Sequence, residues 1–260
     1  MFVERVTMAS TTKIFHHAPY ATISPTSAAS DQTGRNVLIT GAGGGIGYAI
    51  AKAFVQANAS HVILTGHRQG SLDRAAASFA DIGKNTVVST YICDFSNETS
   101  IGGLWQRLRN DHVRVDVLVL NAADSASNPA NPVGSFLPKL RAAFEFNLFA
   151  NASMTAHFLS GTTDNAHTTP KAIVNISSFM AHSNPAPHQA AYSTSKAAFA
   201  HTLQLLADEI AVEECQIVNV HPGAILTEAV QHAPQAMKDA VVWDEGKNTK
   251  KPWFAVGLCC

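Results

Sequence analysis

The sequence predicts an α/β fold in which helices cover both faces of a doubly wound parallel sheet, and three observations lead to this prediction. Six short runs rich in valine and isoleucine alternate along the chain with longer stretches of helical periodicity, which is the order of a parallel sheet. These runs are largely apolar rather than alternating, as expected for strands buried on both faces. A glycine-rich segment joins the first run to the first helical stretch, as is typical of open α/β sheets.

The predicted elements follow one another within a single domain. The six strands are expected at residues 36–40, 61–65, 86–92, 115–120, 172–176 and 216–220. The helices between them are expected at residues 47–57, 71–81, 98–110, 138–159 and 192–213.

The two ends of the chain depart from this pattern. Residues 1–33 contain two prolines, many serines and threonines and no sustained periodicity, so we expect a partly disordered arm before a domain at 34–260. The tail after about residue 223 is atypical, and its polar stretch 242–252 predicts neither a helix nor a strand. The apolar ending WFAVGLCC is compatible with a short helix, a short strand or an unpaired tail.

Composition excludes several classes of function. The chain is 46% hydrophobic, but it has no uninterrupted apolar run of the roughly 18 residues that a membrane-spanning helix needs. Lysine and arginine total 18 against 19 for aspartate and glutamate, so neither a nucleic-acid-binding surface nor a basic membrane patch is indicated. The N-terminus lacks the apolar stretch of a secretory signal, and the 4 cysteines have no metal-ligand spacing. We therefore expect a cytoplasmic protein that binds no metal, nucleic acid or membrane.

The glycine-rich segment reads Gly41-Ala42-Gly43-Gly44-Gly45-Ile46-Gly47 and lies between a predicted strand and a predicted helix. Glycines at such a turn let the backbone approach a pyrophosphate, whose charge then meets the amides at the N-terminus of the helix. A flexible loop is the alternative for a glycine run alone, but the place after the first strand is where a dinucleotide fingerprint belongs. We therefore predict a Rossmann-type dinucleotide site that includes Gly41, Gly43, Gly45, Ile46 and Gly47.

The end of the second predicted strand bears on the choice between the two nicotinamide cofactors. An acidic side chain at this point binds the ribose 2′-hydroxyl of NAD(H) and would repel the 2′-phosphate of NADP(H). Here the chain reads Leu64-Thr65-Gly66-His67-Arg68, with no carboxylate. Either His67 or Arg68 is able to bind a phosphate, arginine through a bidentate pair of hydrogen bonds. NADP(H) is therefore favoured over NAD(H), and the alternative is that Arg68 is a solvated loop residue.

A tyrosine and a lysine open the last predicted helix. Tyr192 and Lys196 are four residues apart and share one helix face, which brings an ammonium near the phenol. A phenol with its reference pKa of about 10 is a poor acid or base at neutral pH, so catalysis needs a nearby positive charge. Ser178 follows another predicted strand and adds a hydroxyl at the carboxyl edge of the sheet. The alternative for Tyr192 and Lys196 alone is an ordinary surface pair.

These motifs, in this order, resemble the classical short-chain dehydrogenase/reductase (SDR) family over about residues 34–230. Thr40-Gly41-x-x-x-Gly45-x-Gly47 is similar to the family's glycine pattern, and Tyr192-x-x-x-Lys196 is similar to its catalytic motif. Other positions match further family motifs, and these are Asp94, Asn121, Asn147, Pro222, Gly223 and Thr227.

The resemblance implies that a hydride moves between the nicotinamide and an alcohol or ketone while Tyr192 gives or takes the proton on oxygen. It implies that Ser178 hydrogen-bonds the substrate oxygen and that Asn147 holds a water in a proton relay. It also implies that Lys196 binds the nicotinamide ribose and lowers the pKa of Tyr192. The family's long helices commonly pair between subunits, so a homodimer or homotetramer is implied as well. The remaining implied cofactor contacts are Asp94, Asn121, Tyr192, Pro222, Gly223 and Thr227.

The sequence departs from the family in several places. Ser178 lies 14 residues before Tyr192 where 13 is usual, and Leu120 and Ala123 replace residues of the family's N-N-A-G motif. The C-terminus lacks the family's further strand with its V-D-G-G-like stretch. One alternative function is a non-catalytic, NADP(H)-binding regulatory or scaffold protein, although it would have little need for Ser178, Tyr192 and Lys196 together. A membrane anchor on a lipidated Cys259-Cys260 is less favoured still.

Overall fold

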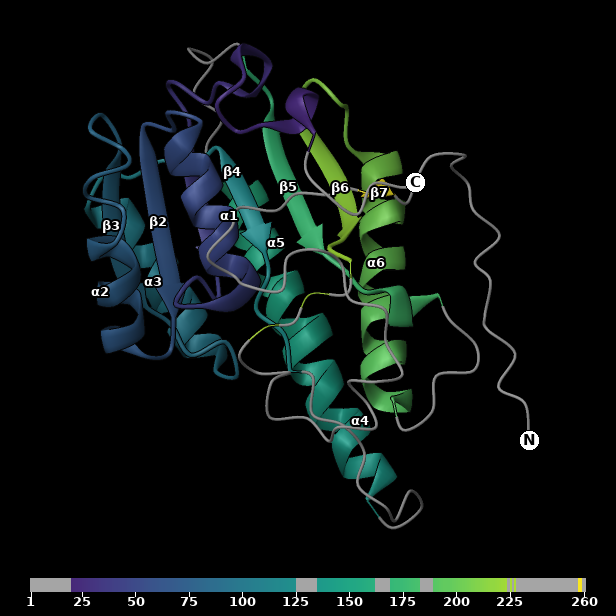
Figure 1. Ribbon diagram of the computed structural model, residues 1–260. Helices are drawn as coiled ribbons and strands as arrows, with labels where there is room; N and C mark the ends of the chain where they lie inside the picture. The colour runs from purple at the N-terminus through teal and green to yellow at the C-terminus, as the bar shows by residue number, and fades with distance from the viewer. Residues whose placement is uncertain are drawn as a thin grey trace.

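A parallel sheet lies at the centre of the fold, and its strand order confirms the predicted doubly wound α/β class (Figure 1). The structure is a computed structural model that describes residues 20–124, 135–161, 169–182, 189–223, 225, 227 and 257–258. The strands lie in the order β3-β2-β1-β4-β5-β6, so the direction of winding reverses between β1 and β4. Ligands of such sheets bind at the carboxyl ends of the strands beside this reversal. The six parallel strands are β1 (Asn36–Thr40), β2 (His61–Gly66), β3 (Val87–Ile92), β4 (Val117–Leu120), β5 (Lys171–Ile176) and β6 (Cys215–His221).

A seventh, short strand extends the sheet at the edge formed by β6. This strand, β7 (Gly257–Leu258), runs antiparallel to β6 and pairs Leu258 with Val220. The sequence left the apolar ending open between a helix, a strand and a tail, and the structure places Gly257 and Leu258 of this ending in a strand, while its other residues lie outside the described part of the chain. A two-residue strand has no periodicity of its own, so only its pairing partner defines it.

One face of the sheet is covered by α1 (Gly45–Gln56) and α2 (Gln69–Ala77). Ile50 and Phe79 from this layer are buried in a core with Ile39 of β1. Burying an aliphatic or aromatic side chain of this size contributes about 1.5–3 kcal/mol. This core therefore holds the connection between β1 and α1, where the glycine turn lies, against the sheet.

The other face is covered by α3 (Glu98–Asn110), α5 (Asn151–Ser160) and α6 (Ala190–Glu209). Phe158 and Phe199 from this layer are buried against Leu118 of β4. Helices on both faces explain why the strands are apolar on both sides. No described helix has both the length and the apolar character that a membrane span requires.

The helix predicted at 138–159 is interrupted in the structure. It consists of α4 (Phe136–Phe144), a π-helical turn labelled η3 (Glu145–Ala150), and α5. Such π-helical turns often lie at functional sites, and η3 contains the predicted site residue Asn147. The helix predicted at 98–110 is confirmed as α3, whereas α1 and α2 each begin two residues before the predicted start and end earlier than predicted. The helix predicted at 192–213 is α6, which ends at Glu209 because the backbone is extended at Ile210.

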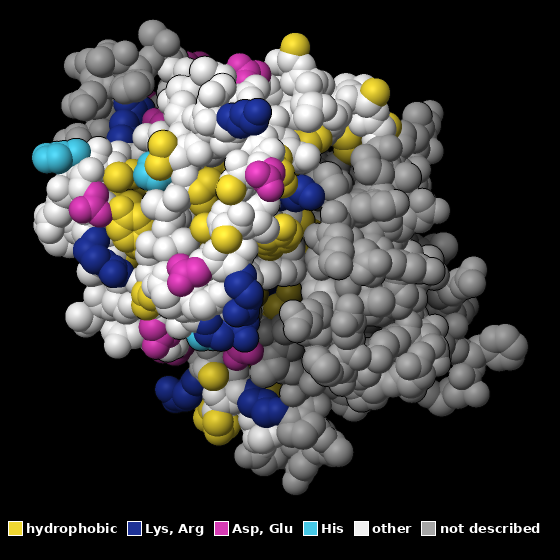
Figure 2. Space-filling view, turned by 60° about the vertical axis from the view of Figure 1, so that its left-hand side comes forward, with side chains coloured by type: hydrophobic (Ala, Val, Ile, Leu, Met, Phe, Trp, Pro, Cys, Tyr) yellow, Lys and Arg dark blue, Asp and Glu magenta, His cyan; other side chains and the backbone are white. Residues whose placement is uncertain are grey.

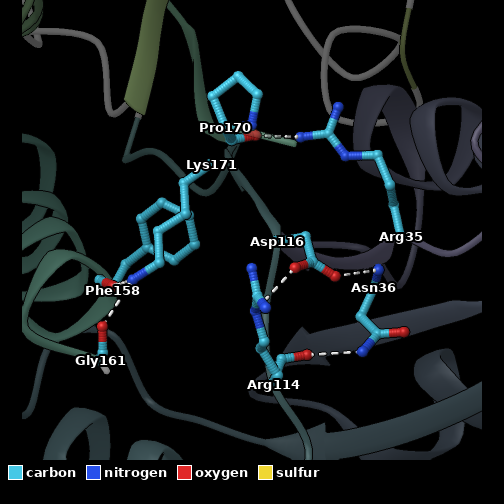
Figure 3. A network of polar contacts seen from close by, with 8 residues as sticks. All are labelled: Arg35, Asn36, Arg114, Asp116, Phe158, Gly161, Pro170 and Lys171. Carbon is cyan, nitrogen blue, oxygen red and sulfur yellow. Dashed lines mark hydrogen bonds and ion pairs between the residues drawn. The ribbon is translucent and has the colours of Figure 1, made fainter. Parts of the chain in front are cut away.

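Polar side chains tie the starts of β1 and β4 together at the amino edge of the sheet (Figure 3). Asp116 accepts a hydrogen bond of 2.8 Å from the backbone amide of Asn36. The same carboxylate pairs with Arg114, whose Nε lies 3.0 Å from Oδ1. The Asn36 side chain in turn donates to the Arg114 carbonyl oxygen at 2.8 Å. These contacts help to fix the register of the two strands on either side of the winding reversal.

Two more cations lie in the same network (Figure 3). Lys171, at the start of β5, is buried and donates to the carbonyl oxygens of Phe158 and Gly161 at 3.0 and 2.7 Å. Arg35 donates to the carbonyl oxygen of Pro170 at 3.0 Å. The Asp116 carboxylate acts electrostatically on both Arg35 and Lys171.

The described part of the N-terminal segment forms two short 3₁₀ turns, η1 (Ala21–Ile23) and η2 (Ala28–Ser30). The backbone amide of Gln32 donates to the Ala57 carbonyl oxygen at 2.7 Å, so this segment contacts the end of α1. The part of the predicted arm before residue 20 lies outside the described residues.

Candidate active site

The glycine turn connects β1 to α1 at the carboxyl edge of the sheet. Gly41 and Gly45 have φ angles of +67° and +56°, a region that residues with a Cβ rarely adopt. Gly47 leaves no room for a side chain, because a Cβ on it would lie 2.4 Å from the carbonyl oxygen of Gly41. Within the described residues no side chain caps the start of α1, so its first amides face an anion-binding position.

Two side chains hold this turn in place. The Thr40 hydroxyl accepts hydrogen bonds of 2.9 Å from the backbone amides of Asn121 and Ala122. The Asn121 side chain donates to the carbonyl oxygens of Thr40 and Gly41 at 2.9 and 3.3 Å. These bonds cross from β4 to β1, where the winding reverses. Asn121, predicted as a cofactor contact, therefore also fixes the shape of the turn.

A cleft of about 390 Å³ opens beside the glycine turn. The predicted cofactor residues that line it are Gly41, Gly43, Gly45, Ile46, His67, Arg68, Asn121 and Thr227. Those that do not line it are Gly47, Asp94, Pro222, Gly223, Tyr192 and Lys196. Gly47 is excluded because it packs against Gly41 within the turn itself.

The connection between β2 and α2 supplies basic side chains to the cleft. His67 and Arg68 are both exposed and both line it. The Arg68 guanidinium has no hydrogen bond or ion pair with any other residue in the described part of the chain, so its donors are available to an anion. Sequence reasoning missed Ser71, which lines the cleft and accepts a hydrogen bond of 3.2 Å from Arg74. A hydroxyl and a guanidinium three residues apart at the start of the helix after β2 was the available signal.

Asp94 forms hydrogen bonds within its own turn, whereas the next residue, Phe95, lines the cleft. The Asp94 carboxylate accepts hydrogen bonds from the Ser96 hydroxyl at 2.7 Å and the Ser96 amide at 2.9 Å, and these bonds lower the pKa of Asp94. Phe95, which the sequence did not single out, lines the cleft together with Phe146. The cleft thus combines aromatic surface with the polar glycine turn.

Ser178 and Tyr192 meet at the carboxyl end of β5. Ser178 caps the short 3₁₀ turn η4 (Phe179–Ala181) by accepting a hydrogen bond of 3.2 Å from the Met180 amide. Its side chain also lies close enough to the phenol of Tyr192, in the first turn of α6, to lower the pKa of that phenol. The 14-residue spacing between the two therefore does not keep them apart.

The pKa of Tyr192 moves in the direction opposite to the predicted one. Burial raises the pKa of Tyr192, and the hydrogen bond from Ser178 opposes this with a smaller lowering. Burial outweighs the hydrogen bond because desolvation disfavours the charged phenolate. In this structure Lys196 is not among the causes of the shift.

Lys196 is buried one helical turn after Tyr192. Its side chain is 2% exposed, and Nζ donates a hydrogen bond of 2.8 Å to the carbonyl oxygen of Ile176. Burial lowers the pKa of Lys196 to about 8. The cation is therefore bound to the last residue of β5, next to the residues that lead into Ser178.

Asn147 is buried in the π-helical turn and bonds the segment that follows β4. Its Oδ1 accepts a hydrogen bond of 2.8 Å from the Asp124 amide, and its Nδ2 donates to the Asp124 carbonyl oxygen at 2.9 Å. Its own carbonyl oxygen accepts a hydrogen bond of 3.1 Å from the buried side chain of Asn151. Sequence reasoning did not consider Asn151.

The end of β6 connects the serine and tyrosine to the glycine turn. Nδ1 of His221 accepts a hydrogen bond of 3.1 Å from the Phe179 amide, directly after Ser178. The chain then turns at Pro222 and at Gly223, whose φ angle is +83°. Thr227 reaches the cleft, where its methyl group lies 3.6 Å from the place that a Cβ on Gly45 would take.

The potential metal ligands among the described residues are dispersed. No three histidine, cysteine, aspartate or glutamate side chains among them gather closely enough to hold a metal ion. Figure 2 shows basic and acidic side chains interspersed over the described part of one face.

This fold and this site define a Rossmann-type protein with a glycine-turn cleft and a Ser-Tyr-Lys group at one sheet edge. A model of the short chain dehydrogenase family matches residues 35–238. The chain therefore belongs to the short-chain dehydrogenase/reductase family of oxidoreductases, as its motifs indicated. The short chain dehydrogenase mpl6 of Monascus purpureus is 31% identical over 257 residues, covering 92% of this chain and 84% of that protein.

Solved structures share the fold as well, among them two complexes with a dinucleotide. The NADP complex of Pseudomonas aeruginosa RhlG has a TM-score of 0.71 at 24% identity, covering 81% of each chain. A 7α-hydroxysteroid dehydrogenase in complex with NADH and 7-oxo glycochenodeoxycholic acid has a TM-score of 0.71 at 24% identity, covering 85% of this chain and 82% of that one.

Proposed function

We propose that the protein transfers a hydride between NADP(H) and an alcohol or ketone, with Tyr192 as the acid and base. The observation that carries this proposal is the closeness of the Ser178 side chain to the Tyr192 phenol, whose pKa it lowers, with Lys196 buried one turn further along α6. This group lies at the end of β5. The adjacent strand β4 is followed directly by Asn121, which lines the cleft beside the glycine turn.

The residues around the cleft fit a dinucleotide. The close contact between Gly41 and Gly47 keeps the turn flat enough for a pyrophosphate to approach the uncapped start of α1. Gly43, Gly45, Ile46 and Asn121 would surround it. When bound, NADP(H) supplies or accepts the hydride, a chemistry that no side chain provides.

The side chains of the chain would handle the proton. Because burial raises its pKa, Tyr192 keeps its proton at neutral pH, as an acid for carbonyl reduction requires. Ser178 touches the phenol and would share the substrate oxygen with it. Lys196, with a pKa lowered to about 8, carries a positive charge at neutral pH that would stabilise the phenolate left after proton transfer.

The preference for NADP(H) rests on Arg68. Its exposed guanidinium lines the cleft, has no partner among the described residues, and stands where a carboxylate would select NAD(H). Ser71 adds a hydroxyl beside it. The two similar solved structures hold NADP in one case and NADH in the other, so they support a dinucleotide and leave the preference to Arg68.

The test combines cofactor binding with turnover. NADPH and NADH are titrated by fluorescence, and their oxidation is followed with a panel of ketones and quinones. We expect tighter binding of NADPH, and a loss of about tenfold or more in NADPH affinity for Arg68→Ala with NADH affinity unchanged. Arg109→Ala removes an exposed cation of α3 and serves as the matched control.

Two outcomes would contradict the proposal. Equal affinities of the wild type for NADPH and NADH would refute the cofactor preference. NADPH binding without oxidation by any substrate of the panel would favour a non-catalytic dinucleotide-binding protein.

We further propose that the chain forms a homodimer or homotetramer through its long helices. Phe149 of η3 and Leu205 of α6 support this, because both are large apolar side chains that are more than half exposed, at 55% and 52%. Light scattering coupled to gel filtration tests it. Phe149→Glu with Leu205→Glu should shift the protein toward the monomer, and an unchanged mass would contradict this interface.

A further inference from the structure

Ser195 lies between the π-helical turn and the first turn of α6, and it is 0% exposed. Its Oγ accepts a hydrogen bond of 3.0 Å from Nδ2 of Asn147. The same hydroxyl donates a hydrogen bond of 2.9 Å to the carbonyl oxygen of Tyr192. One buried hydroxyl therefore acts as acceptor toward one helical segment and as donor toward the residue that carries the reactive phenol.

Asn147 carries this series of bonds on to the end of β4. Its Oδ1 and Nδ2 bond the amide and the carbonyl oxygen of Asp124, at 2.8 and 2.9 Å, and Nδ2 also bonds Ser195. All of these groups belong to the layer at the carboxyl edge of the sheet. An unbroken series of hydrogen bonds thus links the segment after β4, the π-helical turn and the backbone of Tyr192.

The Ser195 hydroxyl is the one link in this series that joins η3 to α6. Without it, one hydrogen of the Asn147 amide would stay buried without an acceptor, which is costly in a site closed to water. The π-helical turn would relax to avoid this, since its extra residue depends on side-chain bonds rather than on regular helix geometry. A relaxed turn would no longer hold the first turn of α6 in a single position.

We propose that Ser195 is a positioning residue: it holds the Asn147 turn against the Tyr192 turn and so fixes the phenol beside Ser178. This inference rests on the proposed function, because the position of the phenol affects the rate only when Tyr192 exchanges a proton. A displacement of about 1 Å at a reacting group lowers a rate by about a hundredfold. Binding of the dinucleotide at the glycine turn does not depend on this link.

The test compares Ser195→Ala with Ser193→Ala. Ser193 stands on the same helical turn, and its buried Oγ has no hydrogen-bond partner among the described residues, so its removal is a matched loss of a hydroxyl. For Ser195→Ala we expect kcat to fall about tenfold to a hundredfold while KM and the NADPH affinity stay within about twofold. Ser195→Thr, which keeps the hydroxyl, should recover part of kcat. Ser193→Ala should match the wild type.

Hydrogen exchange gives a second readout that needs no substrate. The Asp124 amide donates to Asn147, so its protection from exchange should fall in Ser195→Ala and not in Ser193→Ala. If the wild type fails to bind NADPH or to turn over any substrate, the proposed function fails. In that case the exchange of the Asp124 amide still decides whether Ser195 holds the turn.

The outcomes that overturn the proposal are distinct. Equal kcat values for Ser195→Ala and Ser193→Ala would overturn it, and so would unchanged protection of the Asp124 amide. A fall in kcat that is accompanied by a rise in KM and by weaker NADPH binding would indicate general damage rather than a loss of positioning. If Ser195→Ala does not fold, Ser195→Thr and Ser195→Cys replace it. The thiol is a weaker hydrogen-bonding group, so the threonine variant should keep the higher kcat, and the reverse order would refute the proposal.

Discussion

The ammonium of Lys196 donates a hydrogen bond of 2.8 Å to the carbonyl oxygen of Ile176, at the point where β5 leads into Ser178. The side chain is 2% exposed, and burial lowers its pKa to about 8. A charge held in this way lowers the stability of the folded chain at neutral pH. The same positive charge lies one helical turn from Tyr192, where it would stabilise a phenolate.

The first prediction concerns how this lysine makes stability depend on pH. The pKa is about 8 in the folded chain against 10.5 for the free group, so both states are protonated below pH 8 and the full penalty of burial applies there. As pH rises from about 8 to 10.5, the folded state loses its proton first and the penalty fades. The stability advantage of Lys196→Met over the wild type should therefore shrink by roughly 2–3 kcal/mol between pH 7 and pH 10.

Urea unfolding at a series of pH values measures this difference. At each pH the free energy of unfolding of the variant is compared with that of the wild type, so the contributions of the other titrating groups cancel. Lys84→Met replaces an exposed lysine and serves as the control, with no such slope expected. If the difference in the free energy of unfolding between Lys196→Met and the wild type stays constant from pH 7 to pH 10, Lys196 is not held as a buried cation.

The second prediction concerns the glycine turn. A Cβ on Gly47 would lie 2.4 Å from the Gly41 carbonyl oxygen and 2.6 Å from Nδ2 of Asn121, so Gly47→Ala must push the turn open. We expect a loss of about 1–3 kcal/mol in the free energy of unfolding and a loss of at least tenfold in NADPH affinity. Thermal unfolding and fluorescence titration measure the two effects.

Gly102 provides the control for this substitution. It lies in the interior of α3, and a Cβ on it would meet nothing within 4 Å. Gly102→Ala should therefore raise the free energy of unfolding by about 0.5–1 kcal/mol and leave NADPH binding alone. Wild-type affinity for NADPH in Gly47→Ala would contradict the role given to the turn.

The third prediction concerns the network at the opposite edge of the sheet (Figure 3). Asp116 is the one carboxylate drawn among three cations, Arg35, Arg114 and Lys171. Asp116→Asn keeps the shape but removes the charge, so we expect a loss of about 1–3 kcal/mol in stability, less than for a fully buried pair because Arg114 is 24% exposed. Asp73→Asn on the surface of α2 should change stability by less than about 0.5 kcal/mol. Equal effects of the two substitutions on urea unfolding would contradict this account.

The parallel strands could be predicted from sequence because each is a short run rich in β-branched apolar residues, and β1, β2 and β4 are almost entirely buried. β1 covers the predicted residues, and β4 begins two residues later than predicted, at Val117. β7 could not be predicted, since its two residues are defined only by pairing with β6. The π-helical turn could not be predicted either. It depends on bonds from Asn147 to Asp124 and Ser195, which come from distant parts of the chain.

In the candidate site, too, some features could be predicted from the sequence and others could not. Ser178, Tyr192 and the glycine turn follow from local motifs at strand ends and helix starts, and the structure brings Ser178 and Tyr192 into contact. The direction of the Tyr192 pKa shift could not be predicted from its four-residue separation from Lys196. The separation indicates a neighbouring positive charge, but it does not show that the phenol is buried away from water, and burial raises the pKa. Ser71 and Ser195 were missed for a related reason, because serine is common in helices. Ser71 has only a local pairing with Arg74 as a sequence signal, and Ser195 is distinguished only by its tertiary contact with Asn147.

The most direct test of the central claim compares wild type and Tyr192→Phe in two measurements on the same samples. The substitution removes one oxygen atom and leaves the ring that packs at the start of α6. We expect NADPH affinity within about threefold of the wild type and a kcat for ketone reduction lower by at least about a hundredfold. A Tyr192→Phe protein that binds NADPH and turns over ketone at the wild-type rate would contradict the account.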